Sequence, residues 1–208
     1  MDARVDGEHA VFLLRHGRTE WSHSGRHTGR TDIELAPEGE RQAVASGALL
    51  RRLRGEEPPA LVLTSPRVRA RRTAELAGLV DPRVGAVEAT PDLQEWDYGE
   101  YEGLTTPQIR ETVPGWTVWS HPSPGGETPE QVTVRADAVL ERCAAALCDG
   151  DVVLVTHGHV GRVLAARWIG LPAVEGVRIA FGTGAVTVLG SERGVPQLER
   201  VNVAPDEG

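Results

Sequence analysis

The sequence contains no lysine, and all 22 of its basic residues are arginine. This absence excludes Schiff-base chemistry on a lysine, a P-loop lysine and any lysine-dependent grip on a substrate. Cysteine is scarce as well, because the chain has two, Cys143 and Cys148, five positions apart on a predicted helix. Side chains at that spacing diverge, so we expect reduced packing residues rather than a disulfide.

Long apolar runs and an excess of positive charge are also missing. No stretch approaches the roughly 20 apolar residues that span a bilayer, and residues 1–9 lack the apolar core of a signal peptide. We therefore expect a cytoplasmic protein with no membrane partner. The formal net charge of −8 argues against a nucleic-acid partner, because affinity for a phosphate backbone is mostly a cationic effect. No Cys/His cluster has zinc spacing, and we expect neither a metal nor another cofactor.

The alternation of strand-like and helical patterns predicts one α/β domain. A chain of 208 residues is long enough for one core and too short for two comfortable domains. The predicted strands lie at about 10–14, 60–64, 152–156, 179–181, 185–189 and 196–201, and the predicted helices at about 37–54, 67–79, 128–148 and 160–169. This order predicts a three-layer α/β/α sandwich around a central, mostly parallel mixed sheet. We expect the domain to span 10–203, with flexible termini at 1–9 and 204–208.

Two of the predicted strands end in the same way. Arg15-His16-Gly17 follows the apolar run at 10–14, and His157-Gly158 follows the run at 152–156. Ligand sites of open α/β sheets gather at the carboxyl ends of strands. One such histidine could merely cap its strand. Two histidines at strand ends, together with Arg15, indicate a site for an anion.

Two further blocks lie between these strand ends. Ser-Pro-Arg-Val-Arg-Ala-Arg-Arg-Thr-Ala at 65–74 follows the strand at 60–64, and Leu-Gln-Glu-Trp-Asp-Tyr-Gly occupies 93–99. The four blocks in this order, from about Val11 to about Arg167, resemble the histidine phosphatase superfamily, in its phosphoglycerate-mutase-like group. The resemblance implies the fold of that group and phosphoryl transfer through a phosphohistidine.

The resemblance assigns the nucleophile to His16 and the proton donor to Glu95, within the family's Leu-x-Glu-x-x-x-Gly block. A carboxyl group beside Trp96 and Tyr98 could have a raised pKa, which suits a general acid. On composition alone three other acidic residues compete, and loop structure is the role we expect for them: Asp97, Glu100 and Glu102.

The resemblance also implies a cage for the phosphate. Arg15 and Arg69 are the expected clamps, since a guanidinium can bind two phosphate oxygens at once. His157 is the expected hydrogen-bond donor, with the Gly158 amide at a helix N-terminus beside it. For the other arginines at the start of the helix we expect a solvated helix face: Arg67, Arg71 and Arg72.

The loop at 19–32 resembles the family's phosphate-contacting loop. Ser22 stands where the family usually has asparagine and can still donate a hydrogen bond. Thr28 and Gly29 match the family's substrate-contacting pair. We expect His23 and His27 to be surface residues rather than ligands. His159, where the family often has a small residue, is either a donor that supports the site residues or a structural histidine, and we expect the structural role.

The family contains mutases and phosphatases, and two segments separate them. Leu-Thr-Thr at 104–106 stands where mutases carry Leu-Asn-Lys, whereas Pro-Gly-Gly-Glu-Thr at 124–128 and Arg135 resemble the phosphatase branch. We therefore predict a metal-independent phosphomonoesterase, an acid phosphatase that hydrolyses small phosphorylated metabolites through a phosphohistidine. The alternatives are a cofactor-dependent phosphoglycerate mutase and a non-catalytic phospholigand-binding protein. Homodimer formation stays open.

Overall fold

The computed structural model describes residues 9–80 and 87–206 of the chain. In this part the chain forms one six-stranded sheet with the strand order β3-β2-β4-β1-β5-β6. The strands are β1 Val11–Arg15, β2 Leu61–Thr64, β3 Glu88–Ala89, β4 Val152–Thr156, β5 Val186–Glu192 and β6 Val195–Val203. β3, β2, β4 and β1 are parallel to one another, and β5 runs antiparallel to both of its neighbours.

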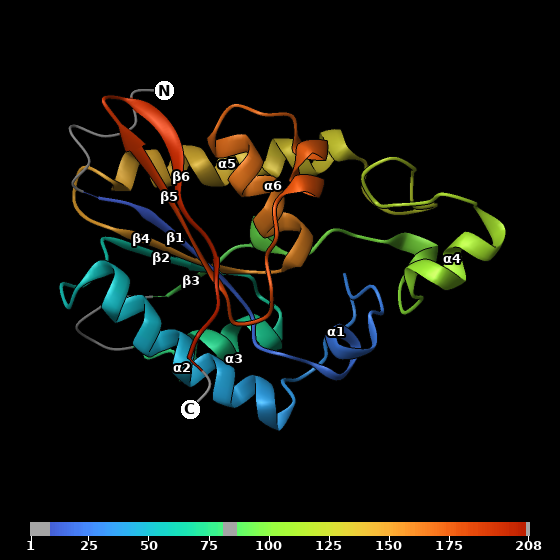
Figure 1. Cartoon of the computed structure of the whole chain (residues 1–208), viewed down its shortest axis with the longest axis horizontal. Helices are drawn as coiled ribbons and strands as arrows, with labels where there is room; N and C mark the ends of the chain where they lie inside the picture. The colour runs from blue at the N-terminus through green and yellow to red at the C-terminus, as the bar shows by residue number, and fades with distance from the viewer. Residues whose placement is uncertain (1–8, 81–86, 207–208) are drawn as a thin grey trace.

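Helices cover both faces of the sheet (Figure 1). α2 Pro37–Arg54 and α3 Val68–Leu76 lie on one face, and α5 Pro129–Ala146 and α6 Gly158–Trp168 on the other. Because successive side chains of a strand point to opposite faces, β1 contributes Phe12 to the core beneath α2 and α3, and Leu13 to the core beneath α5 and α6. The predicted α/β sandwich and its mixed sheet are confirmed.

The segment 91–127, which carries few regular patterns, holds only short elements in the described residues. These are the 3-10 helices η1 Pro91–Leu93 and η2 Gly99–Tyr101 and the helix α4 Thr106–Thr112. Together with α1 Glu20–Ser24, α4 lies beyond the end of the sheet toward which the parallel strands run (Figure 1). A further 3-10 helix, η3 Ala173–Arg178, follows α6. These short elements surround the carboxyl ends of the strands.

The prediction of a strand at 179–181 is wrong, since these residues form a loop. The loop passes the end of β1, where the carbonyl oxygen of Phe181 accepts a hydrogen bond from Arg15 at 2.6 Å. Three apolar residues are too few to separate a strand from a buried loop. β3 was not predicted, because a two-residue strand carries no periodic pattern.

Both cysteines are free, with Cys143 buried in α5 and Cys148 exposed after the end of that helix. No helix in the described part of the chain is long and apolar enough to cross a membrane. The predicted flexible termini fall largely on residues 1–8 and 207–208, which lie outside the described residues. The single-domain boundaries at 10 and 203 stay a prediction.

Candidate active site

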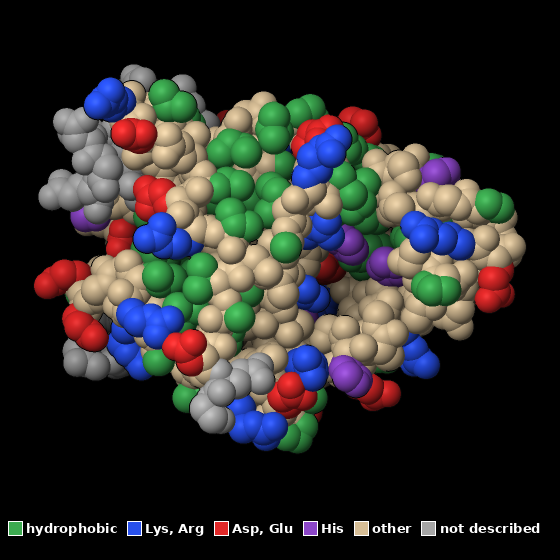
Figure 2. Space-filling model, in the orientation of Figure 1, with side chains coloured by type: hydrophobic (Ala, Val, Ile, Leu, Met, Phe, Trp, Pro, Cys, Tyr) green, Lys and Arg blue, Asp and Glu red, His purple; other side chains and the backbone are tan. Residues whose placement is uncertain are grey.

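The parallel strands deliver the two histidines to one edge of the sheet. β1 and β4 pair in register, with Arg15 opposite Thr156. The residue that follows each strand is a histidine. The ring centroids of these two residues, His16 and His157, lie 5.1 Å apart. A cavity of about 200 Å³ opens at this edge, and Figure 2 shows it as a hollow with arginine and histidine side chains along its wall.

The cavity brings together six of the nine residues that the sequence predicts for the site. Arg15, His16, Ser22, Thr28, Glu95 and Gly158 line it. Arg69 and His157 are fully buried behind His16 rather than part of the wall. Gly29 lines a neighbouring cavity on the far side of Glu95.

His16 is held as a neutral imidazole with a defined free nitrogen. Its Nδ1 lies 2.8 Å from the carbonyl oxygen of Gly17, and a carbonyl oxygen only accepts, so Nδ1 carries the proton. Burial lowers the pKa of His16 well below its ordinary value, and the positive charges of Arg69 and Arg15 lower it further. The Nε2 lone pair is therefore available as a nucleophile near neutral pH.

Gly17 has a packing role. A Cβ on this residue would lie 2.2 Å from the carbonyl oxygen of Gly39, so only glycine lets the chain after β1 pass this close to α2. The same region is tied to α3 by a hydrogen bond from the Gly17 N–H to the Thr73 hydroxyl at 3.1 Å. These contacts fix the backbone that carries His16.

His157 and Arg69 form a buried pair behind His16. Nε of Arg69 donates to Nδ1 of His157 at 3.1 Å, so the second nitrogen of the neutral ring carries the proton and donates to the Ser65 hydroxyl at 2.7 Å. Arg69 also donates to the carbonyl oxygens of Thr28 and Thr31, both at 2.9 Å. Arg69 thus joins β4 to the loop at 28–31, and donation from His157 to a phosphate would replace its contact with Ser65.

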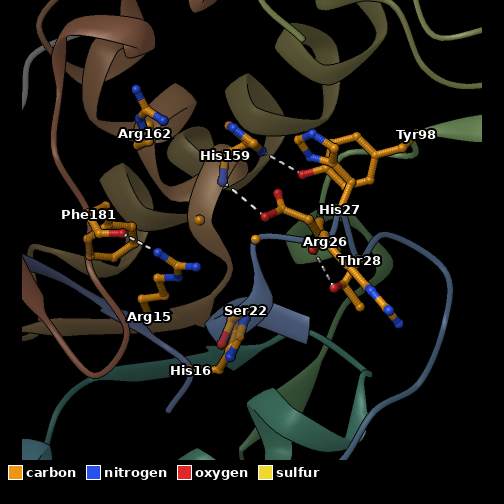
Figure 3. A pocket seen from close by; sticks show the side chains of 13 residues that line it. Arg15, His16, Ser22, Arg26, His27, Thr28, Tyr98, His159, Arg162 and Phe181 are labelled. Carbon is orange, nitrogen blue, oxygen red and sulfur yellow. Dashed lines mark hydrogen bonds between the residues drawn. The ribbon is translucent and has the colours of Figure 1, made fainter. Parts of the chain in front are cut away.

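Arg15 projects from the end of β1 against the start of α6 (Figure 3). A Cβ on Gly158 would lie 3.1 Å from Cζ of Arg15, so the glycine is what allows this approach. Nη1 donates to the Phe181 carbonyl oxygen at 2.6 Å, while the buried Nε has no hydrogen-bond partner among the described residues. The guanidinium is oriented by one contact and keeps donors for a ligand.

Glu95 accepts hydrogen bonds from the N-terminus of α6. Its carboxylate receives the backbone N–H groups of His159 and Val160, each at 3.0 Å, and that of Trp96 at 2.9 Å. Burial raises the pKa of Glu95, but the neighbouring His159 and these three N–H groups outweigh burial and hold the pKa below its ordinary value.

The expectation of a raised pKa at Glu95 is therefore wrong. Trp96 and Tyr98 are buried beside it as the sequence suggested, but the helix N-terminus, which stabilises the ionised form, could not be read from the local sequence. Of the competing carboxylates, Asp97 accepts from the Gly99 N–H and pairs with Arg30, and Glu102 accepts from the N–H groups of the loop at 29–31. These two have the loop-structuring roles that were expected.

Two expected surface or structural histidines belong to the wall of the cavity. His27 packs against Tyr98, with ring centroids 4.7 Å apart, and is not a surface residue. His159 lines the cavity and lies 2.5 Å from the Tyr98 hydroxyl through Nδ1 (Figure 3). Burial raises the pKa of Tyr98 well above its ordinary value, so the hydroxyl keeps its proton and donates to His159. His23 is exposed, as expected.

Sequence reasoning missed the arginines and the loop residue that complete the wall: Arg26, Arg162 and Phe181. Arg162 lies four residues after Gly158 on α6, and this spacing places both on one helix face. Arg67 also departs from the expected solvated face. It precedes α3, and its Nη2 donates to the Gln94 side chain at 2.6 Å.

The loop residues of the site are held by local contacts. The Ser22 hydroxyl donates to the carbonyl oxygen of Thr19 at 3.0 Å, within the capping box of α1. The Thr28 hydroxyl donates to the carbonyl oxygen of Arg26 at 3.2 Å. The Gly29 N–H donates to the Glu102 carboxylate at 2.9 Å. A phosphate contact by either hydroxyl would require it to rotate away from its present acceptor.

This arrangement of two strand-end histidines, buried arginines and one carboxylate can be compared with known proteins. Residues 11–204 match the family model of the histidine phosphatase superfamily (branch 1). The chain belongs to the histidine phosphatase superfamily. The predicted family is confirmed, and the fold of this histidine phosphatase is the one that the family implies.

Several relatives of this histidine phosphatase have named activities. It is 47% identical over 190 residues to an acid phosphatase of Mycobacterium tuberculosis, covering 91% of this chain and 90% of that protein. It is 33% identical over 182 residues to a glucosyl-3-phosphoglycerate phosphatase of the same species, with coverage of 79% and 77%. A probable phosphoglycerate mutase, GpmB, of Klebsiella pneumoniae is 32% identical over 169 residues, with coverage of 78% and 76%.

Solved structures agree with this assignment. The structure of an open reading frame product of Mycobacterium tuberculosis superposes with a TM-score of 0.88 at 45% identity, covering 95% of this chain and 98% of that one. A mycobacterial glucosyl-3-phosphoglycerate phosphatase in complex with VO3 gives a TM-score of 0.80 at 29% identity, with coverage of 94% and 100%. The relatives support a phosphoric monoester hydrolase of the histidine phosphatase family more than they support a mutase.

Proposed function

We propose that this histidine phosphatase is a metal-independent acid phosphatase that cleaves small phosphorylated metabolites through a phosphohistidine. The observation that carries the proposal is the state of His16: a buried neutral ring whose Nδ1 proton is held by Gly17 and whose Nε2 is free. A cavity of about 200 Å³ suits a phosphate with a leaving group of a few carbon atoms. One relative is named for a small phosphorylated compound, glucosyl-3-phosphoglycerate, and another is named as an acid phosphatase.

In the first half-reaction Nε2 of His16 attacks the phosphorus, and the bond from phosphorus to the ester oxygen breaks. Arg15, with the charge of Arg69 behind it, stabilises the negative charge on the equatorial oxygens. Glu95 gives a proton to the departing oxygen, so the products are an alcohol and the phosphohistidine. Because Glu95 is ionised in the free enzyme, this proton arrives with the substrate, as the proton of a phosphate monoanion.

In the second half-reaction a water molecule attacks the phosphorus of the phosphohistidine. Glu95, now ionised, accepts the proton of the attacking water. The bond from phosphorus to Nε2 breaks, and inorganic phosphate leaves. His16 returns to its starting tautomer because the Gly17 carbonyl oxygen holds the Nδ1 proton throughout. The ring therefore needs no rearrangement between turnovers.

A mutase must instead hold a bisphosphate and return the phosphoryl group to a second position of the substrate. In this chain Thr106 stands in the lysine position of mutases, and its hydroxyl contacts Nε2 of His27 at 3.2 Å. The contact joins α4 to the cavity wall without adding a positive charge. The lack of a positive charge at this position favours hydrolysis over return of the phosphoryl group to a second position of the substrate.

Phosphate release tests the proposed function. We expect inorganic phosphate from p-nitrophenyl phosphate and from small alkyl phosphates at an unchanged rate in EDTA, because arginines supply the positive charge. The same preparation should interconvert 2- and 3-phosphoglycerate, primed by the bisphosphate, more slowly than it releases phosphate. Faster interconversion would favour the mutase, restoration of an EDTA-sensitive rate by zinc or magnesium would contradict the mechanism, and no turnover at all would favour a phospholigand-binding protein.

The arginines are tested by comparing three substitutions. Arg15→Ala and Arg69→Ala should each cost about 2.7–4 kcal/mol of transition-state stabilisation, the scale for losing a preorganised charge-stabilising donor. Arg67→Ala should cost far less, because its guanidinium contacts Gln94 and not the cavity. The measurement is kcat/KM for p-nitrophenyl phosphate, with thermal unfolding as the control for misfolding of the buried Arg69 variant. An equal loss at Arg67 would show that the wrong arginine has been assigned.

A further inference from the structure

Arg162 is an arginine of the cavity wall that the proposed mechanism does not use. It lies on α6 one turn after Gly158, and both residues face the cavity. In Figure 3 its guanidinium lies on the same side of the cavity as His159, away from His16. Arg162 thus lies on the part of the cavity wall that is away from His16.

The guanidinium of Arg162 is fixed in place by neutral groups. Its Nε donates to the Gly176 carbonyl oxygen at 2.9 Å and its Nη2 to the Val177 carbonyl oxygen at 2.8 Å. Its Cζ lies 4.8 Å from the ring centroid of Trp119, a cation–π contact. A Cβ on Gly176 would lie 3.0 Å from that ring, so glycine permits this packing.

This half-buried charge has no acidic partner. Among the described residues the hydrogen bonds of Arg162 go only to backbone carbonyl oxygens, through Nε and Nη2, and it forms no ion pair with a carboxylate. The cavity wall holds three arginines but one carboxylate, that of Glu95. Burial lowers the pKa of Arg162 and the charge of Glu95 raises it, which agrees with a cation that gains from a nearby anion. An anion on a ligand that reached this half-buried guanidinium would form a charge-assisted hydrogen bond in a partly desolvated site.

We propose that Arg162 forms a second oxyanion subsite, which binds a carboxylate or a phosphate carried by the leaving group of the substrate. The inference rests on the proposed phosphatase function and adds the class of substrate: short phosphomonoesters with a second anionic group. Arg15 binds the transferred phosphoryl group, and Arg162 binds the other end. A cavity of about 200 Å³ suits a chain of a few carbon atoms between the two anions.

Matched substrates test the subsite. We compare kcat/KM for phosphoglycolate with ethyl phosphate, for 3-phosphooxypropanoate with propyl phosphate, and for propane-1,3-diol bisphosphate with propyl phosphate. The anionic member of a pair should be preferred by roughly 10- to 100-fold, the range of a hydrogen bond to a charged group. The pair with the larger preference shows whether the subsite binds a carboxylate or a phosphate.

Variants assign the preference to the guanidinium. Arg162→Met keeps the packing on Trp119 and removes the charge, so the ratio within each pair should fall close to one. Arg162→Lys should retain part of the ratio. Arg178→Met is the matched control, because this exposed arginine pairs with Glu175 and lies outside the cavity lining. It should keep the wild-type ratio.

A structural role for Arg162 predicts a different result. If Arg162 only held η3 in place, Arg162→Met would lower thermal stability and reduce both members of each pair equally, and the proposal would be overturned. Equal rates within the pairs in the unaltered enzyme would overturn it as well.

Binding of phosphonates separates this proposal from the proposed function, because it requires neither turnover nor a substitution. Calorimetry on the unaltered enzyme should give tighter binding for 3-phosphonopropanoate than for propylphosphonate. Equal affinities would contradict the subsite. A preference in binding without hydrolysis of any ester would contradict the phosphatase function and leave the subsite supported.

Discussion

His16→Ala should abolish covalent labelling of the enzyme by a phosphorylated substrate and reduce kcat by up to the order of 10⁶, the scale known for loss of a covalent nucleophile. The reason is that His157, the histidine in ring contact with His16, has no free lone pair to replace Nε2. His157 is 5.1 Å away between ring centroids, and both of its nitrogens are engaged, with Arg69 and with Ser65.

The measurement is rapid-quench labelling with a ³²P-labelled phosphomonoester. A phosphohistidine is a phosphoramidate, so the label should be lost in acid and survive in alkali, unlike a phosphoserine. His23→Ala is the matched control, because this histidine is exposed and does not line the cavity. Label of the same stability in His16→Ala would contradict the assignment of the nucleophile.

Glu95→Gln should slow phosphorylation of the enzyme by alkyl phosphates by about 10²- to 10⁴-fold, the usual contribution of a general acid. The effect should be far smaller with p-nitrophenyl phosphate, since p-nitrophenolate leaves without much protonation. Single-turnover experiments with both substrates isolate this step. Asp97→Asn is the control, because Asp97 accepts from the Gly99 N–H and pairs with Arg30.

An equal loss with both substrates in Glu95→Gln would mean that Glu95 positions the phosphate. A selective loss with alkyl phosphates in Asp97→Asn would move the proton donor to that residue. Thermal unfolding of both variants is needed, since the glutamine amide would face the N–H groups of His159 and Val160 that now donate to a carboxylate.

The pH dependence follows from the same groups. Because the pKa of Glu95 lies below its ordinary value, the free enzyme has an ionised carboxylate near neutral pH. The proton must enter on a phosphate monoanion, which exists below a pKa of about 6. For alkyl phosphates kcat/KM should therefore fall as pH rises through about 6. Protonation of His16 should limit activity only well below its ordinary pKa, since burial and two arginines lower that pKa.

The sequence by itself determined the order of the main strands and helices and the family. The apolar runs that end in Arg15-His16 and in His157 were sufficient, because buried strands need continuous apolar residues and a polar residue at the end of such a run marks the sheet edge. The predicted helix 37–54 has the same bounds as α2. Glu95 was found through the spacing of a motif rather than through its surroundings.

Only the tertiary structure decided how the site residues are held and charged. The lowered pKa of Glu95 comes from the N-terminus of α6, more than 60 residues away in the sequence. The tautomer of His157 is fixed by Arg69 from another element, and Arg162 reaches the cavity wall because one turn of α6 and a glycine in η3 place it there. Local patterns record which residues are buried, whereas hydrogen bonds and charges between distant segments depend on how the whole chain packs.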